Sequence, residues 1–247
     1  WWDHRGPGFI ARLPWRFDLG EMLRLVRFGL PAAMQMTFEV GVFATATALA
    51  SRLSPESLAA HHVVLNIASV TFMVPLGVGS AAAVLVGQAL GRGDGSLART
   101  TGWKCMALGV GFMVFSCSFF LLAPDTILGA YSSEPGVITA GKAILLVAAF
   151  FQLSDGTQTV STGALRGLGD TRTPMYANLV GHWAIGLPLG VYLCFYADWG
   201  LRGLWIGLSI GLTFVALMLL WAWSRASARA AKGDWAAPAS AASAAIH

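Results

Sequence analysis

Four polar side chains recur along one apolar stretch of the sequence at the spacing of an α-helix. In chain order they are Gln152, Asp155, Thr159 and Thr162, at steps of three, four and three residues. These steps place all four on one stripe of a helix. An ionised Asp near the centre of a bilayer costs on the order of 2.5–3.5 kcal/mol, so such a residue normally faces a cavity or a partner. The pattern predicts a helix that presents Asp155 to a wet interior, where its carboxylate could hold a proton or a cation.

The composition is typical of a membrane protein. Hydrophobic residues make up 56% of the 247 positions and charged residues 11%, whereas soluble domains contain about 25% charged residues. Several apolar runs exceed the roughly 18 residues that a bilayer crossing requires. The three Cys residues lie in apolar runs without metal or disulfide spacing. We therefore expect an all-α, polytopic membrane protein that needs no cofactor.

Six apolar stretches are long enough to form transmembrane helices. They are expected at residues 30–51, 58–90, 103–123, 137–165, 174–197 and 203–223. Pro75 and Pro188 should kink or break the second and fifth of these helices. Residues 24–224 then form the transmembrane lobe. Segment 1–23 is expected to lie at the membrane surface as a linker, with a disordered leader as the alternative. Residues 225–247 are rich in Ala and Ser and are expected to be a disordered tail.

The basic residues predict how these helices are oriented. With the N-terminus in the cytoplasm, thirteen of the 16 Lys and Arg residues lie on the cytoplasmic side. Only Arg52, Lys142 and Arg202 lie outside. The positive-inside rule therefore predicts that both termini are cytoplasmic. It also explains the net charge of +4 without a nucleic-acid partner.

A second carboxylate lies at the depth of Asp155. Glu39 comes eight residues after Pro31 and Asp155 ten residues before Leu165, which places them about 12 and 15 Å into the membrane. No Lys or Arg is expected at that depth. Two such carboxylates hold a proton near neutral pH or close around a cation, and either property would suit ion-coupled transport. The alternative is an inert protonated acid that is hydrogen-bonded between helices.

Other polar and aromatic residues could line the same cavity. Gln35 lies one turn before Glu39, and Phe43 one turn after it. Asn66 shares a helix face with His62 and Ser69. Asn178 and His182 are one turn apart, and they could instead form hydrogen bonds between helices.

Enzyme motifs do not account for these residues. Gly167 to Asp170 spells GxGD, which is associated with intramembrane aspartyl proteases, but Asp155 is fifteen residues away on the same chain segment. That separation is about 22 Å on a helix, so the two Asp side chains cannot form a local dyad. Neither HExxH nor GxSxG occurs. We expect a protein that is not an enzyme.

Longer stretches of the sequence resemble a known family. FQLSDGTQ, GALRGLGDTRTP, HWAIGLPLG, PAAMQMTFEVGVF and LAAHHVVLNIASVTFMVPLGVGSAAAVLVGQALGRGD are similar to the second half of multidrug and toxic compound extrusion (MATE) antiporters of the NorM-like branch. The resemblance implies one six-helix lobe of a twelve-helix transporter, with a preceding N-terminal lobe as its partner. It also implies that Glu39 and Asp155 are the cation-binding acids. Some members have a Tyr four residues before the Asp, where this chain has Phe151, so sodium coordination from that position is in doubt.

The resemblance implies a multidrug efflux antiporter, monomeric when full length, in the inner membrane of a bacterium. Protons or sodium would exchange for amphiphilic, cationic compounds, within a lipid environment. A lone lobe is not expected to transport unaided. A lipid-linked oligosaccharide flippase of the same superfamily is the alternative, although its cavity should be lined with Arg or Lys. A channel or a structural subunit is a further alternative, recognisable by ion flux that does not depend on a drug.

Overall fold

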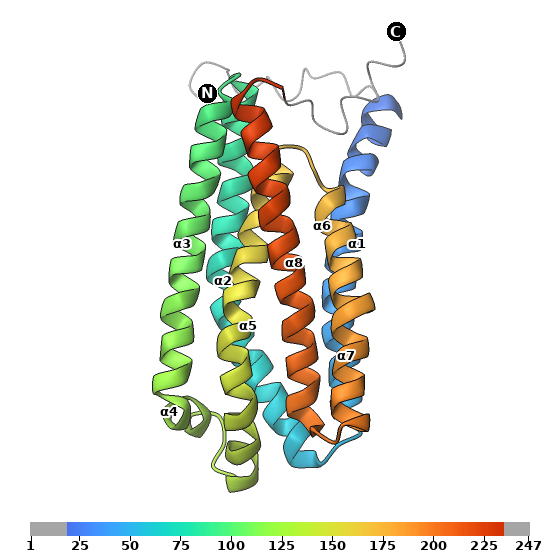
Figure 1. Ribbon diagram of the computed structural model, residues 1–247, viewed down its shortest axis with the longest axis vertical. Helices are drawn as coiled ribbons and strands as arrows, with labels where there is room; N and C mark the ends of the chain where they lie inside the picture. Colours follow the sequence, from blue (N-terminus) through green and yellow to red (C-terminus); the bar gives the residue numbers. More distant parts are fainter. Residues whose placement is uncertain (1–18, 235–247) are drawn as a thin grey trace, which may run out of the picture.

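The computed structural model describes residues 19–234, and all the regular structure in them is helical. The elements are α1 (Leu19–Ala50), α2 (Pro55–Gly91), α3 (Gly95–Leu122), α4 (Pro124–Gly129), α5 (Pro135–Gly167), α6 (Arg172–Asn178), η2 (Leu179–Gly186), α7 (Leu187–Val191), η3 (Tyr192–Tyr196) and α8 (Gly200–Ala231). The segments η2 and η3 are π-helical, and α6 to η3 form one continuous rod. The long helices run up and down the bundle, so the first residues of α1 and the last of α8 lie at the same end (Figure 1).

Five of the described helices are long and apolar enough to cross a membrane: α2, α3, α5, the rod from α6 to η3, and α8. The sixth expected span, α1, is a helix of 32 residues but is not among these five. It carries Gln35, Thr37 and Glu39 in its middle, and these residues lower its mean hydropathy. The expected all-α membrane fold is confirmed.

Side-chain caps determine where two of the helices begin. Ser54 accepts a hydrogen bond from the backbone N–H of Ser57 (3.2 Å), directly before Pro55 in the first turn of α2. Asp94 accepts one from the N–H of Leu97 (2.8 Å) and starts α3. Such caps satisfy N–H groups that lack an intrahelical partner. The helices therefore extend beyond their apolar runs into residues that the sequence analysis assigned to loops.

Glycines allow the central helices to approach closely. A methyl group on Gly163 of α5 would lie 2.0 Å from the carbonyl oxygen of Gly79 on α2. A methyl group on Gly207 of α8 would lie 2.2 Å from the backbone nitrogen of Gly190 on α7. Small residues at such crossings are typical of helix packing in membranes. Around these contacts α5 packs between α2, α3 and α8 (Figure 1).

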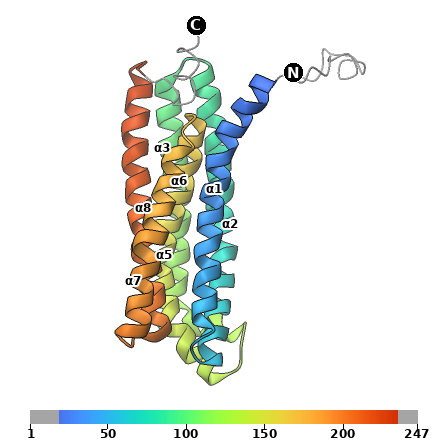
Figure 2. The same cartoon turned by 90° about the vertical axis from the view of Figure 1, so that its right-hand side faces the viewer.

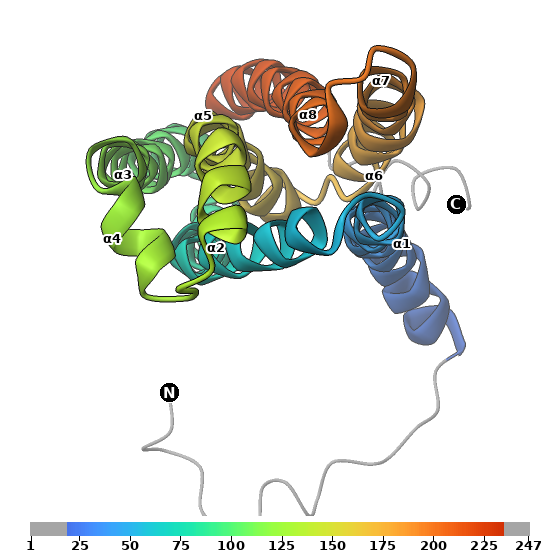
Figure 3. The same ribbon diagram turned by 90° about the horizontal axis from the view of Figure 1, so that it is seen from below.

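Helix α1 lies at the side of this core. It packs mainly along α6 and η2 (Figures 2 and 3). Trp183 of η2 donates a hydrogen bond from Nε1 to the carbonyl oxygen of Phe38 (3.0 Å). Val42, Ala46 and Ala50 of α1 belong to the buried core, whereas Leu23, Val26 and Met36 are exposed. Residues of α1 between 35 and 47 form one wall of a cavity.

Pro75 was expected to kink or break the second apolar helix, and α2 continues through it without a break. It lies inside the continuous helix α2 and is buried there. A proline removes one backbone hydrogen bond, and packed neighbouring helices can hold the remaining ones in place. Pro188 lies in α7, between the two π-helical segments, so the helix there changes its hydrogen-bond register without ending.

The helix ends also differ from the expected segment boundaries. Helix α1 begins at Leu19, within the expected linker, and α8 continues to Ala231, beyond the expected start of the tail. The rest of the linker (1–18) and of the tail (235–247) lies outside the described residues. Charged side chains at a membrane surface remain compatible with a helix, so the end of an apolar run does not mark the end of a helix.

Candidate functional site

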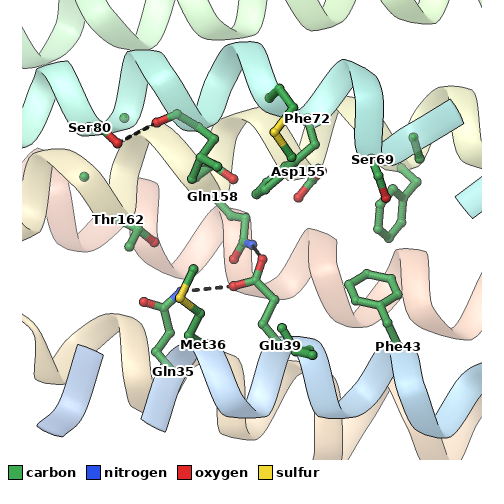
Figure 4. Close-up of a pocket in the computed structure, with 18 of the residues that line it drawn as sticks. Gln35, Met36, Glu39, Phe43, Ser69, Phe72, Ser80, Asp155, Gln158 and Thr162 are labelled. Atoms are coloured by element: carbon green, nitrogen blue, oxygen red, sulfur yellow. Dashed lines mark hydrogen bonds between the residues drawn. The ribbon is translucent and has the colours of Figure 1, made fainter. Parts of the chain in front are cut away.

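A cavity of about 740 Å³ lies between α1, α2 and α5 in the described part of the chain. Most of its wall is apolar and includes Met36, Phe72 and Met73. Polar side chains reach it from all three helices, as Figure 4 shows for several of them. These are Gln35, Glu39 and Thr47 of α1, Ser69 and Ser80 of α2, and Asp155, Gln158, Thr159, Thr162 and Arg166 of α5. The cavity is thus an apolar chamber with a polar band across it.

Glu39 is the polar centre of the α1 wall. Its Oε2 accepts a hydrogen bond from Nε2 of Gln35, one turn earlier on α1 (3.1 Å). Its Oε1 accepts a hydrogen bond from Nε2 of Gln158 on α5 (2.9 Å) (Figure 4). Each carboxylate oxygen therefore has an amide donor, and the second of these bonds crosses the cavity from α5 to α1.

Asp155 faces Glu39 from α5. Its side chain is 8% exposed and lines the same cavity. It interacts electrostatically with Glu39 and with Gln158, which lies three residues later on α5. Two carboxyl groups in one partly dry chamber repel each other when both are ionised, and a proton or a cation between them removes that repulsion. The arrangement can therefore hold a small positive ion.

Arg166 lies closer to these acids than the sequence analysis predicted. We expected it in a loop, but it lies in the last turn of α5 and lines the cavity. Its Nη2 donates a hydrogen bond to Oε1 of Gln35 (2.6 Å), and its guanidinium interacts electrostatically with Glu39. The expectation that no cation stands near the acids is therefore wrong. Helix α5 continues past the end of its apolar stretch, and the long side chain of Arg166 extends from its last turn back into the cavity.

Eight residues were expected to line a cavity with the acids, and the structure places four of them on this one. These are Gln35, Phe43, Phe151 and Thr159. Phe151 packs edge-to-face on Phe43, with 6.0 Å between ring centroids. The two rings form an aromatic part of the cavity wall, and Phe43 lies on the side of Glu39 away from Gln35 (Figure 4).

The other four residues lie elsewhere. Asn66 is exposed and accepts a hydrogen bond from the hydroxyl of Tyr131 (3.2 Å). Gln152 is buried against α2 and α3, where it accepts hydrogen bonds from the hydroxyls of Thr71 and Ser116. Asn178 donates to the carbonyl oxygen of Pro174 (3.0 Å). His182 is buried behind Phe43, with 6.3 Å between the ring centroids.

Gln158 was not among the predicted site residues, although the sequence carries a signal for it. Gln158 is three residues from Asp155, a spacing that places two side chains next to each other on a helix. We instead paired Asp155 with Gln152, which is equally close in sequence on the other side. In the structure, Gln158 is the residue that links α5 to Glu39.

Comparison with known proteins identifies the family. A family model named MatE matches residues 31–192, which is more than half of the chain. The chain belongs to the MatE family. Its relatives include the multidrug resistance protein NorM of Burkholderia vietnamiensis, 43% identical over 211 residues, which cover 83% of this chain and 46% of that protein. A probable multidrug resistance protein NorM of Brucella suis is 43% identical over 216 residues, which cover 85% of this chain and 46% of that protein.

Solved MATE structures have the same fold. The crystal structure of the eukaryotic MATE transporter AtDTX14 superposes with a TM-score of 0.78 at 23% identity, over 88% of this chain and 51% of that one. The bent form of the Vibrio cholerae MATE transporter VcmN superposes with a TM-score of 0.77 at 16% identity, over 88% of this chain and 49% of that one. The chain therefore spans about half the length of the MATE relatives it matches.

Membership of the MatE family shows which class of protein the chain belongs to. MATE proteins are membrane transporters and not enzymes, in agreement with the sequence analysis. The five apolar helices and the bacterial NorM relatives indicate a multi-pass membrane protein. Among the described residues, no group of three or more His, Cys, Asp or Glu side chains is placed to hold a metal ion.

Proposed function

We propose that this chain is the C-terminal lobe of a multidrug efflux antiporter, in which Glu39 and Asp155 bind the coupling ion. The observation that carries the proposal is that both carboxyl groups line one cavity, on facing helices. A proton or a sodium ion entering down its gradient binds between them. Coupling requires only that ion and drug favour different conformations of the transporter.

The drug is an amphiphilic compound that carries a positive charge. The apolar wall, with Met36, Phe72 and Met73 among its residues, suits the apolar part of such a molecule. Flexible Met side chains adapt to ligands of different shape. The two acids suit the charge, so an ion and a cationic drug favour the same band of the cavity.

A lipid-linked oligosaccharide flippase is the less suitable candidate. A cavity for anionic lipid phosphates calls for several Arg or Lys side chains. Among the described residues that line this cavity, Arg166 is the one cation, and its Nη2 is engaged with Gln35. The NorM relatives are called multidrug resistance proteins, which favours drug efflux over lipid transport.

We place the transporter in the cytoplasmic membrane of a bacterium, with both termini in the cytoplasm. The bundle end that holds the start of α1 and the end of α8 also carries most of the basic residues (Figure 1). Cytoplasmic segments attract Lys and Arg in this way. The partner is an N-terminal six-helix lobe, because relatives of twice this length would close the cavity with a second bundle.

The proposal is tested by drug efflux from everted vesicles that contain the two-lobe protein, with pH and sodium gradients imposed separately. Glu39→Gln and Asp155→Asn should each abolish the gradient dependence while leaving membrane insertion intact. Glu56→Gln is the matched control, because Glu56 is exposed in the first turn of α2, and it should behave as the wild type. Unaltered gradient-driven efflux in both acid variants would contradict the proposal.

A further inference from the structure

Gln158 combines two features that the ion-binding acids alone do not explain. It is 1% exposed and lines the cavity between Asp155 and Thr162 on α5 (Figure 4). Its Nε2 donates to Oε1 of Glu39 on the facing helix (2.9 Å). Because a carboxylate accepts hydrogen bonds only, this contact fixes which end of the amide is nitrogen. The carbonyl oxygen of Gln158 therefore points away from Glu39.

That carbonyl oxygen is buried without a hydrogen-bond partner among the described residues. A buried acceptor left unpaired costs about 1–3 kcal/mol, so each one in a native structure needs an explanation. The hydroxyls of Thr159 and Thr162 are also buried without a partner in this part of the chain, and both residues line the same cavity. Three neutral oxygens on one face of α5 thus lie beside Asp155 with their lone pairs unused.

We propose that Gln158 is a direct ligand of the coupling cation, which it binds through its side-chain carbonyl oxygen together with the carboxylates of Glu39 and Asp155. The cation is an alkali metal ion, sodium under cellular conditions. This inference rests on the proposed function, because it places the ion between the same two acids. It adds Gln158 as a third residue of the site.

The donor set distinguishes a metal ion from a proton. A proton needs one carboxylate oxygen and one acceptor, whereas a hard metal cation is surrounded by several oxygens, including carboxylates and amide carbonyls. The described residues contain no third acidic ligand near the pair. Gln158 and the two Thr hydroxyls are the buried oxygens that remain available to complete the shell.

Binding of the cation requires the side-chain amide of Gln158 to rotate, so that its carbonyl oxygen takes the place of its nitrogen. A cation between the carboxylates repels the N–H group that now faces Glu39 and attracts the carbonyl oxygen. Rotation of the amide exchanges the positions of its N–H group and its carbonyl oxygen. The hydrogen bond from Gln158 to Glu39 is then broken, and the two residues are linked instead by the cation that both of them bind. Glu39 keeps its second donor, Gln35, whose orientation is held by Arg166. The carboxylate therefore stays in place while Gln158 turns.

The chain offers a matched control for this residue. Gln152 is the same residue type on the same helix and is also 1% exposed. Its carbonyl oxygen already accepts hydrogen bonds from Thr71 and Ser116 on the side of α2 and α3. Met is unbranched and similar in size to Gln but has no carbonyl oxygen. The variants Gln158→Met and Gln152→Met therefore remove the same group from the cavity and from the packed core.

The test is sodium binding to the purified two-lobe transporter, measured by titration calorimetry, with thermal unfolding as a check on folding. Gln158→Met should raise the sodium Kd by about tenfold or more, as expected for the loss of a group that completes a metal site. Gln152→Met should leave the sodium Kd unchanged. If Gln158→Met does not fold, Gln158→Leu supplies the same measurement with a branched side chain.

The outcomes separate this inference from the proposed function. Sodium binding that is lost in Asp155→Asn but unchanged in Gln158→Met overturns the role of Gln158 and leaves the two acids in place. A wild-type protein that does not bind sodium, yet couples efflux to a proton gradient, overturns the metal assignment. Acid variants that bind sodium as the wild type does overturn both proposals.

Discussion

Arg166 and Gln35 are joined across the cavity by a hydrogen bond of 2.6 Å from Nη2 of the guanidinium to Oε1 of the amide. Because Arg166 holds the carbonyl oxygen, the amide nitrogen of Gln35 faces Glu39, to which it donates at 3.1 Å. A cation in the last turn of α5 thus fixes the orientation of a donor on α1. Arg166 acts on the proposed ion site through this amide and through the electrostatic interaction of its guanidinium with Glu39.

We expect Arg166 and Gln35 to be energetically coupled. In a double-mutant cycle of Arg166→Met and Gln35→Leu, the free energy of unfolding in detergent should show a coupling of about 1.5 kcal/mol, because a hydrogen bond from a charged donor is lost only once. Arg172→Met, which changes an exposed residue at the start of α6, should combine additively with Gln35→Leu. Additive costs for Arg166→Met and Gln35→Leu would show that the bond contributes nothing to stability.

Helical periodicity and the count of residues from the helix ends were sufficient to pair Glu39 with Asp155. Both arguments depend only on the fixed rise and turn of an α-helix. An acid in an apolar helix must also turn away from lipid, so two such acids at one depth favour a common chamber. The structure does place the two side chains on one cavity.

The identity of the neighbouring glutamine could not be predicted in this way. Gln152 and Gln158 are each three residues from Asp155, so both lie about 60° around the helix from it, in opposite directions. Periodicity does not indicate which of them turns to the cavity. The choice is made by Thr71 on α2 and Ser116 on α3, which bind Gln152. Contacts between distant segments of the chain therefore determine which of the two glutamines belongs to the site.

We expect Gly207 to be required for the fold. In Gly207→Ala the added methyl would lie 2.2 Å from the backbone nitrogen of Gly190, and backbone atoms cannot move aside as a flexible side chain can. Overpacking of this kind costs about 1–3 kcal/mol or more. The midpoint of thermal unfolding in detergent should fall, together with the yield of folded protein. Gly111→Ala on α3, where nothing lies within 4 Å of the added methyl, should be neutral or slightly stabilising. Equal midpoints for the two variants would contradict the close approach of α7 and α8.

His61 joins three helices through both of its ring nitrogens, although the sequence analysis considered only its neighbour His62. Nδ1 of His61 accepts a hydrogen bond from Nε1 of Trp205 on α8 (3.2 Å). Since an indole nitrogen can only donate, Nδ1 carries no proton, and in the neutral ring the proton is on Nε2. Nε2 lies 2.9 Å from the hydroxyl of Thr47 on α1 and donates to it. The imidazole is completely buried, so both contacts are needed to satisfy it.

Trp205→Phe should therefore destabilise the lobe by about 1–3 kcal/mol, because it leaves Nδ1 of His61 buried without a donor. Trp199→Phe is the matched control, since Trp199 is 54% exposed, and its unfolding midpoint in detergent should be close to that of the wild type.

The smaller ring of Phe also removes packing area at position 205. To separate the two effects, Trp205→Phe is measured again in a His61→Leu background, where no imidazole acceptor remains. The substitution should cost less there than in the wild type, and an equal cost in both backgrounds would show that the hydrogen bond to His61 does not stabilise the lobe.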